Sequence, residues 1–552
     1  MKALWVRFSV VLAVLAFSAL YFVPQTGWIL RTQLRMIAST LPEKALMLSL
    51  GIEPEKVGLS KEESARVKAL TKQRLSQVAE RFPDDERLQI AFVLATSEHD
   101  LLPDRLRDLL RRFPNSPMLH AAILRYDCLK RIHLDRKERY LLSESPVPTK
   151  LLRSDPRHLV AFEGIAAKGE RIDPDNAFFP MMRAVALFAA HRDEEALQAL
   201  MRASRKSRWD DYALDEFEGI KRLWEDAFGK PNGLQKISLS AFILPPHLSV
   251  MRAPAYIATY KAMELERSGR LSEGLEIRLA LMRCGRLMRE QRKTTLARTV
   301  GTAIAHIAVN RPKGEPLPPP PRKAELAEAR GKQIQERFVS YLRQIGQAET
   351  AKWVQEELRA GRQLRQELID KVQRSPYLDE LASAWAVDLM LLSVIAILLA
   401  MWSIAGISVG VERLAMGGKQ ISEPEQRPMK FAAVLLLAVW LASVVWLWKV
   451  GAIKWLWVTY DAAMAISSLS EKTTLLPPPL TQAILLNLVA MGTLAFAVVV
   501  GILVSRKGVA FSRALVQGVW QWALPMAAMI FLLYAVNLVI TAIWEGRLYI
   551  PI

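Results

Sequence analysis

The chain has 552 residues, of which 51% are hydrophobic and 23% are charged, and its formal net charge at pH 7 is +19. This length and apolar content exclude a small single domain and an intrinsically disordered chain. The two cysteines, Cys128 and Cys284, are too few for a disulfide scaffold or a cysteine-rich metal site, and we expect both to be buried free thiols.

The first apolar segment lies between Arg7 and Arg31 and contains 23 consecutive uncharged residues. A helix of that length crosses about 30 Å of hydrocarbon. The basic start at Lys2 and Arg7 is also typical of a secretory signal peptide. We favour an uncleaved transmembrane anchor over residues 1–30, because the apolar residues continue past the expected cleavage point.

Residues 31–310 show apolar periodicity of 3.6 residues and scarcely any alternating β-branched run, which predicts an all-α soluble domain. A proline followed by polar residues recurs before apolar helical patterns, at Pro83, Pro114, Pro156 and Pro174. These steps predict a series of helix starts.

Two stretches of this domain share a spacing of small and apolar residues. The first is Ala184, Leu187, Ala196, Leu200 and Ala203, and the second is Ala262, Leu265, Gly269, Glu273 and Gly274. Residues about 80–300 resemble tetratricopeptide-like helical-repeat proteins in this spacing. The resemblance implies helix hairpins stacked as a solenoid, with an extended surface for protein partners. An irregular helix-hairpin domain is the alternative.

A basic strip is expected on one helix of this domain. Five cations fall on one side of the helix at about 100° per residue, namely Arg278, Arg286, Arg289, Arg292 and Lys293. Leu279, Leu281 and Leu287 fall on the other side, which predicts an outward basic strip for an acidic partner or anionic lipid headgroups. An ordinary solvated face is the alternative. No nucleic-acid partner is expected, because no binding motif accompanies the charge.

Residues 311–322, RPKGEPLPPPPR, predict an extended proline-rich linker, with a ligand for a proline-binding groove as the alternative. Residues 323–380 then predict a long polar helical segment. These two segments separate the soluble domain from the apolar end of the chain.

Residues 381–552 predict a bundle of four further transmembrane helices. The apolar runs lie between Asp388 and Glu412, between Lys430 and Lys449, from about Leu480 to Val504, and between Arg513 and Glu545. Residues 451–470 favour an interfacial helix, although a further crossing remains open. The complete expectation is therefore an all-α chain with a helical-repeat domain and a multi-pass membrane bundle.

The orientation follows from lysine and arginine in the short loops, which are enriched on the cytoplasmic side. One side carries nine such residues and the other carries four. This bias predicts a cytoplasmic N-terminus and an extracytoplasmic location for residues about 31–382, in the inner (cytoplasmic) membrane of a cell envelope.

Polar residues within the expected spans are Asp388, Asn487 and Asn537. The expected depths of Asn487 and Asn537 place the two amides within reach of each other, as contacts between helices. A polar spot on a substrate path is the alternative. Gly406 and Gly410 form a GxxxG pattern that favours close helix packing, either inside the bundle or in a dimer.

No catalytic, nucleotide or metal-binding motif occurs in the sequence, so it predicts no cofactor and no enzymatic activity. We expect a protein-binding scaffold or assembly factor in the cell envelope, embedded in the lipid bilayer. A subunit of a transporter or channel with a helical sensing domain is the alternative. An enzyme whose site is assembled from distant residues is a third.

Overall fold

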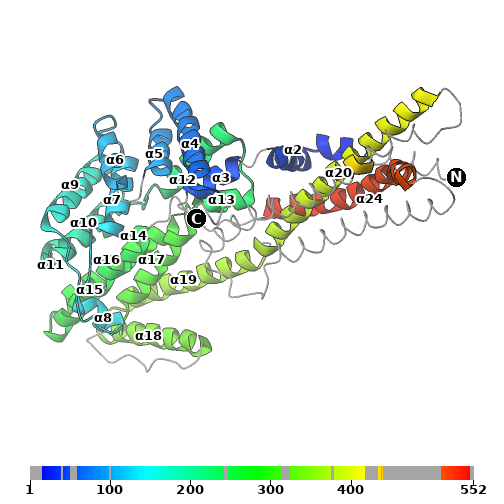
Figure 1. Cartoon of the computed structure of the whole chain (residues 1–552). Coiled ribbons are helices and arrows are strands. Elements are labelled where there is room, and N and C mark those ends of the chain that lie inside the picture. Colours follow the sequence, from blue (N-terminus) through cyan, green and yellow to red (C-terminus); the bar gives the residue numbers. More distant parts are fainter. Residues whose placement is uncertain are drawn as a thin grey trace. The chain divides into compact units, whose positions relative to one another are not determined.

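The computed structural model describes residues 15, 17–38, 41–49, 59–97, 101–143, 145–240, 246–291, 293–311, 324–374, 378–416, 433–436, 438 and 511–547. Within these residues the regular structure is helical, and the only β-type pairing is an isolated bridge between Asn176 and Arg208 (Figure 1). The expectation of an all-α protein is therefore confirmed for this part of the chain.

The chain divides into two compact units. The long-helix unit comprises Met1–Thr71, Lys230–Ser238 and Ser375–Leu548, and the hairpin unit comprises Lys72–Gly229, Leu239–Arg374 and Tyr549–Ile552. The expected domain boundary at residue 30 falls inside a helix, α2 (Pro24–Ala38). The long-helix unit also takes a short segment, Lys230–Ser238, from the middle of the sequence.

The hairpin unit contains most of the helices. In chain order they are α5 (Glu86–Thr96), α6 (Leu102–Leu109), α7 (Pro117–Lys130), α8 (Lys137–Ser143), α9 (Pro156–Ile172), α10 (Phe178–Ala189), α11 (Asp193–Ser204), α12 (Ala213–Phe228), α14 (Pro246–Val250), α15 (Arg252–Arg267), α16 (Leu271–Glu290), α17 (Thr295–Ala308), α18 (Ala324–Gln344) and α19 (Ala348–Arg374). Another helix, α4 (Lys61–Arg81), contributes its later residues to this unit.

Several of these helices begin where the sequence predicts. The Asp85 side chain caps α5 after Pro83, and the Ser116 side chain caps α7 after Pro114, each by accepting a backbone N–H of the first turn. Asp155 caps α9 in the same way, and Pro156 occupies the first helical position, where its missing N–H costs nothing. The predicted helix starts at these prolines are confirmed.

Three helix hairpins share one turn geometry. The turns of α10–α11, α15–α16 and α18–α19 each contain one residue with positive φ, namely His191 (59°), Gly269 (87°) and Gly346 (78°). The residue that follows the positive-φ residue donates its backbone N–H to the carbonyl of the residue five positions before it. The N···O distances in the three turns are 2.9, 2.9 and 2.8 Å. This is a Schellman-type helix end, which reverses the chain within three residues.

Small residues bring the two helices of each hairpin close together. Ala184 and Ala196 are fully buried at equivalent positions of α10 and α11, seven residues before and five after the positive-φ residue. Ala262 and Gly274 occupy the same positions in the second hairpin, where a Cβ on Gly274 would lie 2.7 Å from the Ala262 carbonyl oxygen. The third hairpin has Ala351, also fully buried, at the later position.

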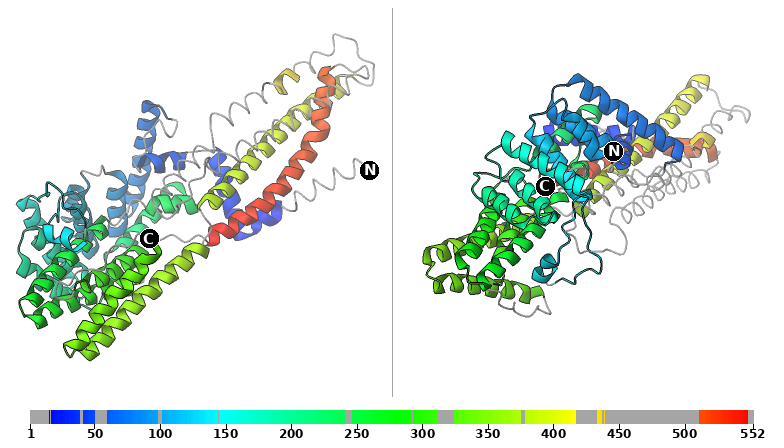
Figure 2. Two further views of the ribbon diagram at one scale, coloured as in Figure 1. Left: turned by 90° about the horizontal axis from the view of Figure 1, so that it is seen from below. Right: turned by 90° about the vertical axis from the view of Figure 1, so that its left-hand side faces the viewer.

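The third hairpin corrects the expectation for residues 323–380. Instead of one long polar segment, two helices fold back on each other at Gly346, and they lie side by side in Figure 2. Phe338, Leu342 and Val354 are fully buried in the same apolar core as α10 and α16. Residues 324–374 are therefore part of the hairpin unit, because their apolar face is covered.

Both cysteines lie in the hairpin unit as buried free thiols, as expected. Burial raises the pKa of each thiol to about 12, so neither is a reactive thiolate at neutral pH.

The long-helix unit contains α2, α3 (Leu41–Ser49), most of α13 (Gly233–Ser240), α20 (Leu378–Met416) and α24 (Phe511–Arg547). Within α20 and α24, Val387–Val411 and Leu515–Arg547 are long and apolar enough to cross a membrane. They coincide with two of the five expected spans and lie side by side (Figure 2). The expected span at 480–504, residues 8–14 and 16 of the first span, the 430–449 span apart from residues 433–436 and 438, residues 312–322 and residues 451–470 lie outside the described residues.

Helices α16 and α17 approach each other closely at a glycine pair, Gly285 and Gly301. A Cβ on Gly301 would lie 2.5 Å from the Gly285 carbonyl oxygen and 2.6 Å from the Met288 Cβ. We expect Gly301→Ala to lower the free energy of unfolding by about 1–3 kcal/mol, because a methyl group forces the helices apart. Urea-induced unfolding of the full chain in detergent measures this change.

Gly164 provides a matched control for that substitution. It is exposed in the middle of α9, and a Cβ there would meet nothing within 4 Å. Gly164→Ala should raise the free energy of unfolding by about 0.5–1 kcal/mol through helix propensity alone. Equal effects of the two substitutions would contradict the close contact between α16 and α17.

Candidate functional site

A groove of about 450 Å³ crosses the second helices of the three hairpins. We call it the hairpin groove, and it is lined by Ser204 of α11, by Leu279, Arg283, Arg286 and Leu287 of α16, and by Glu349, Thr350 and Trp353 of α19. The four residues from α16 follow helical spacing, so they project from one face of that helix. Three hairpins that are distant in sequence therefore contribute to one surface.

The hairpin groove combines an apolar floor with two arginines and one glutamate, Glu349. Leu279, Leu287 and Trp353 pack against the core and remain partly exposed. Arg286 is 43% exposed and donates to Glu290 at 2.8 Å. Arg283 is exposed and forms no ion pair with other residues that the structure describes. This chemistry fits a partner segment that carries an apolar side chain beside a carboxylate.

The predicted outward basic strip is wrong for Arg278. This side chain is fully buried and donates through Nε to Glu266 at 2.6 Å and through Nη1 to the carbonyl oxygens of Ala308 and Asn310 at 2.7 Å. A buried guanidinium needs such partners, because its desolvation is costly. Arg278 thus joins α15 and α16 to the end of α17.

Arg289 is also buried, where it forms an ion pair with Glu357 of α19. The reason for both errors is that α16 packs against α15, α11 and α17 at once, so little of its surface is left for a solvated strip. Leu279 and Leu287 pack against the core, as expected, and they also line the hairpin groove together with Arg286.

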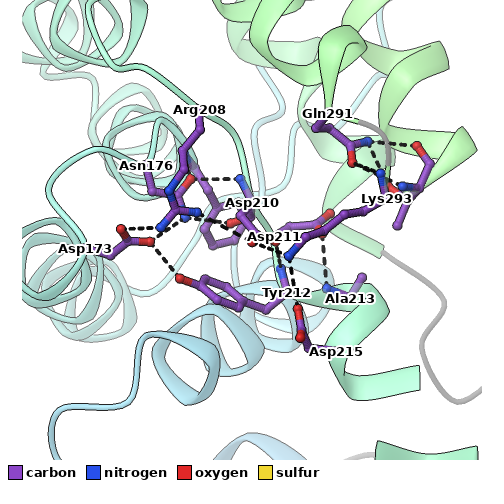
Figure 3. A network of polar contacts seen from close by, with 12 residues as sticks. Asp173, Asn176, Arg208, Asp210, Asp211, Tyr212, Ala213, Asp215, Gln291 and Lys293 are labelled. Carbon is purple, nitrogen blue, oxygen red and sulfur yellow. Dashed lines mark hydrogen bonds and ion pairs between the residues drawn. The ribbon is translucent and has the colours of Figure 1, made fainter. Parts of the chain in front are cut away.

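The other two cations of the strip have different locations. Lys293 donates to Asp210 at 2.6 Å and to Asp215 at 3.2 Å, within the polar network of Figure 3. Arg292 lies outside the described residues. Arg286 is therefore the only one of the five that the structure places at the hairpin groove.

The network in Figure 3 fixes the chain after α11. Asn176 donates its amide to the Asp210 carbonyl at 2.8 Å and accepts the Asp210 backbone N–H at 2.9 Å, while Arg208 pairs with Asp173 at 2.5 Å. The drawn side chains bond to one another. We interpret this network as a structural element that holds the segment between α11 and α12.

Four charged or titratable groups meet in the core without any sequence signal. Arg125 pairs with Glu216, and the His247 Nε2 lies 3.1 Å from Asp211. Burial raises the pKa of Glu216 to about 7 despite Arg125, and burial lowers the pKa of His247 despite Asp211. Asp211 and Glu216 lie close in sequence, whereas Arg125 and His247 come from other helices, so periodicity and motif spacing could not have grouped the four residues.

A polar cluster lies between the apolar helices of the long-helix unit. The fully buried Asp388 accepts hydrogen bonds from Gln33, Asn537 and Thr541, each at 2.8 Å. The Tyr534 hydroxyl donates to the Gln33 Oε1 at 2.7 Å and so orients that amide. The cluster joins α2, α20 and α24.

The expected contact between Asn487 and Asn537 is not tested, because Asn487 lies outside the described residues. Asn537 uses its amide for Asp388 and for the Ala384 carbonyl at 2.9 Å. Gln33 was not predicted as a partner of Asp388, because residue 33 lay beyond the expected end of the first span. Gln33 lies among Arg31, Thr32 and Arg35, so no local pattern marked it.

The two glycines of α20 differ in their surroundings. A Cβ on Gly406 would lie 2.2 Å from the Trp520 ring of α24, whereas a Cβ on Gly410 would meet nothing within 4 Å. The Trp520 ring also stacks on Trp402 with 4.7 Å between ring centroids. Gly406 therefore serves packing within the long-helix unit.

Among the described residues, no group of three or more histidine, cysteine, aspartate or glutamate side chains is arranged to hold a metal ion. Comparison of the chain with protein-family models, curated proteins and solved structures finds no match.

Substitution of Arg278 and Arg286 tests directly that the first side chain is buried and the second half-exposed. Arg278→Ala leaves the Glu266 carboxylate buried without its guanidinium, and we expect the free energy of unfolding to fall by about 3–5 kcal/mol. Arg286→Ala removes a half-exposed charge, so the change should stay below about 1 kcal/mol. Urea-induced unfolding of the full chain in detergent measures both, and similar values for the two variants would contradict the assignment.

Proposed function

We propose that this chain is a multi-pass protein of the inner membrane whose extracytoplasmic hairpin unit docks partner proteins, as a scaffold or assembly factor of the cell envelope. The hairpin groove is the observation that carries this proposal. It combines partly exposed leucine and tryptophan side chains with Arg283, which is exposed and forms no ion pair with other residues that the structure describes. Aromatic and arginine side chains of this kind dominate the energetics of protein interfaces.

The repeated turn supports a tetratricopeptide-like architecture for the hairpin unit. Three hairpins share the positive-φ residue, and the first two also carry the expected pairs of small residues. The positive-φ residues lie 78 and 77 residues apart, at 191, 269 and 346, so other helices separate the hairpins in sequence. Stacked hairpins of this type form extended surfaces that suit peptide segments.

The membrane part of the proposal draws on two observations. Val387–Val411 and Leu515–Arg547 have the length and composition of spans. The bias of lysine and arginine in the sequence supports a cytoplasmic N-terminus, as argued above. The lipid bilayer is therefore the environment that we propose for the long-helix unit.

A transport function finds less support than docking. Asp388 is the polar group on which a substrate path would depend, and both of its oxygens accept hydrogen bonds from other side chains of the unit. Such mutual bonding favours a contact between helices. Anionic lipid headgroups are also weaker candidates for the groove, since Arg278 and Arg289 are buried.

A photo-cross-linking amino acid at position 353 tests the docking function. With the residue in place of Trp353, irradiation of intact membranes should yield a discrete covalent adduct with another protein, because Trp353 lines the hairpin groove. The same amino acid at Val160, which is 71% exposed on α9, serves as the matched control and should give no discrete adduct. Adducts of equal yield at both positions, or at neither, would contradict the proposal.

Charge reversal tests the role of the groove cations. We expect Arg283→Glu to reduce the adduct yield at position 353 at least about fivefold, which corresponds to about 1 kcal/mol of binding free energy. Arg111→Glu is the control. The Arg111 side chain is 88% exposed just after α6, so this change should leave the adduct yield unchanged. An unchanged adduct yield with Arg283→Glu would contradict a role of the Arg283 charge in docking.

A further inference from the structure

A second cavity of the hairpin unit lies on a different set of helices from the hairpin groove. Its volume is about 280 Å³, and we call it the His306 pocket. Its lining residues are Arg252 and Tyr256 of α15, Ala303, His306 and Ile307 of α17, Val309 and Asn310 after α17, and Gly331, Ile334 and Gln335 of α18. The lining therefore combines four apolar side chains with several hydrogen-bonding groups and one glycine.

Among the residues that the structure describes, the lining contains one cation and no carboxylate. Arg252 is exposed, and its guanidinium donates to the Tyr256 hydroxyl at 3.2 Å. The charges of three arginines outside the lining, Arg362, Arg365 and Arg289, also act on His306. Of these, Arg289 is paired with Glu357, whereas Arg362 donates to the uncharged Gln335. The resulting field attracts an anion.

The protonation state of His306 follows from its neighbours. Arg362 donates to Gln335 Oε1, so the Gln335 amide presents its NH₂ group to the His306 Nε2 at 3.4 Å. The imidazole then accepts at Nε2 and carries its proton on Nδ1. Burial, followed by the charges of Arg362, Arg365 and Arg289, lowers the pKa of His306 to about 4, in agreement with a neutral ring at pH 7.

The walls of the pocket are held in place by neighbouring contacts. Arg278 binds the carbonyl oxygens of Ala308 and Asn310, which fixes the chain where α17 ends. Gly361 lets α19 approach α17 beside the histidine, since a Cβ there would lie 2.8 Å from Thr302 and 3.8 Å from His306 Nε2. A pocket with fixed walls loses little entropy on binding a ligand.

We propose that the His306 pocket binds a small organic carboxylate, with Arg252 as its counter-charge, the neutral His306 as a hydrogen-bond donor and the apolar side chains around its hydrocarbon part. This site is separate from the hairpin groove and does not depend on the docking function. A volume of about 280 Å³ suits a short aliphatic acid rather than a polymer.

Hexanoate is the probe that tests this proposal. Hexanamide, which has nearly the same shape but no charge, is the control ligand. Binding to the full chain in detergent is measured by isothermal titration calorimetry or ligand-observed NMR at pH 7. We expect saturable binding of hexanoate and at least about tenfold weaker binding of hexanamide, because only the carboxylate meets the charge of Arg252. Equal binding of both ligands, or no saturable binding, would overturn the proposal.

Gly331 allows the pocket to be filled without disturbing the core. A Cβ at Gly331 would meet nothing within 4 Å, so Gly331→Leu places a side chain in the cavity. This variant should lose hexanoate binding at least about tenfold, whereas Gly164→Leu, the same change on the exposed face of α9, should bind as the unaltered chain does. Unaltered binding by Gly331→Leu would place the ligand elsewhere and refute the assignment.

Arg252→Gln provides the separate test of charge. The side chain is exposed and its one described hydrogen bond goes to Tyr256, so the fold should survive the change, which circular dichroism checks. Hexanoate binding should weaken at least about tenfold while hexanamide binding stays the same. A variant that retains full affinity for hexanoate would contradict the role of Arg252.

Discussion

A tight helix reversal around one left-handed residue is the constraint on which the hairpin unit depends. His191, Gly269 and Gly346 each adopt a positive φ, and the chain returns along the preceding helix within three residues. The reversal allows small residues such as Ala184 and Ala196 to meet, so paired helices bury a common apolar core. The hairpin groove is a consequence, because α11, α16 and α19 are each the second helix of such a pair.

Buried ion pairs are the second organising feature of the structure. They explain why the burial of the arginines on α16 was difficult to predict. Arg278 with Glu266 and Arg289 with Glu357 lie on faces of α16 that its neighbours cover. Both arginines are tolerated there because carboxylates and carbonyl groups replace water. Asp388 follows the same rule between α2, α20 and α24, with amide and hydroxyl donors in place of a cation.

The features that could be predicted from sequence were those carried by local pattern. Helix starts at Pro156 and after Pro114, two hairpins, the free cysteines and the apolar helices α20 and α24 all have local signals. The third hairpin was missed because its helices are polar on average, although Gly346 marked the turn. The burial of Arg278 and the partnership of Gln33 with Asp388 depend on tertiary contacts, which no periodicity encodes.

Hydrogen exchange of the intact protein tests the central claim, that the hairpin groove is where partners dock. The protein is isolated gently from membranes and compared with the same sample after a high-salt wash, which screens contacts to Arg283 and Arg286. The account predicts that the wash removes amide protection from Leu279–Leu287 and Glu349–Trp353, the segments that line the groove. Unchanged protection in these segments, or a loss confined to other helices such as α9, would contradict it.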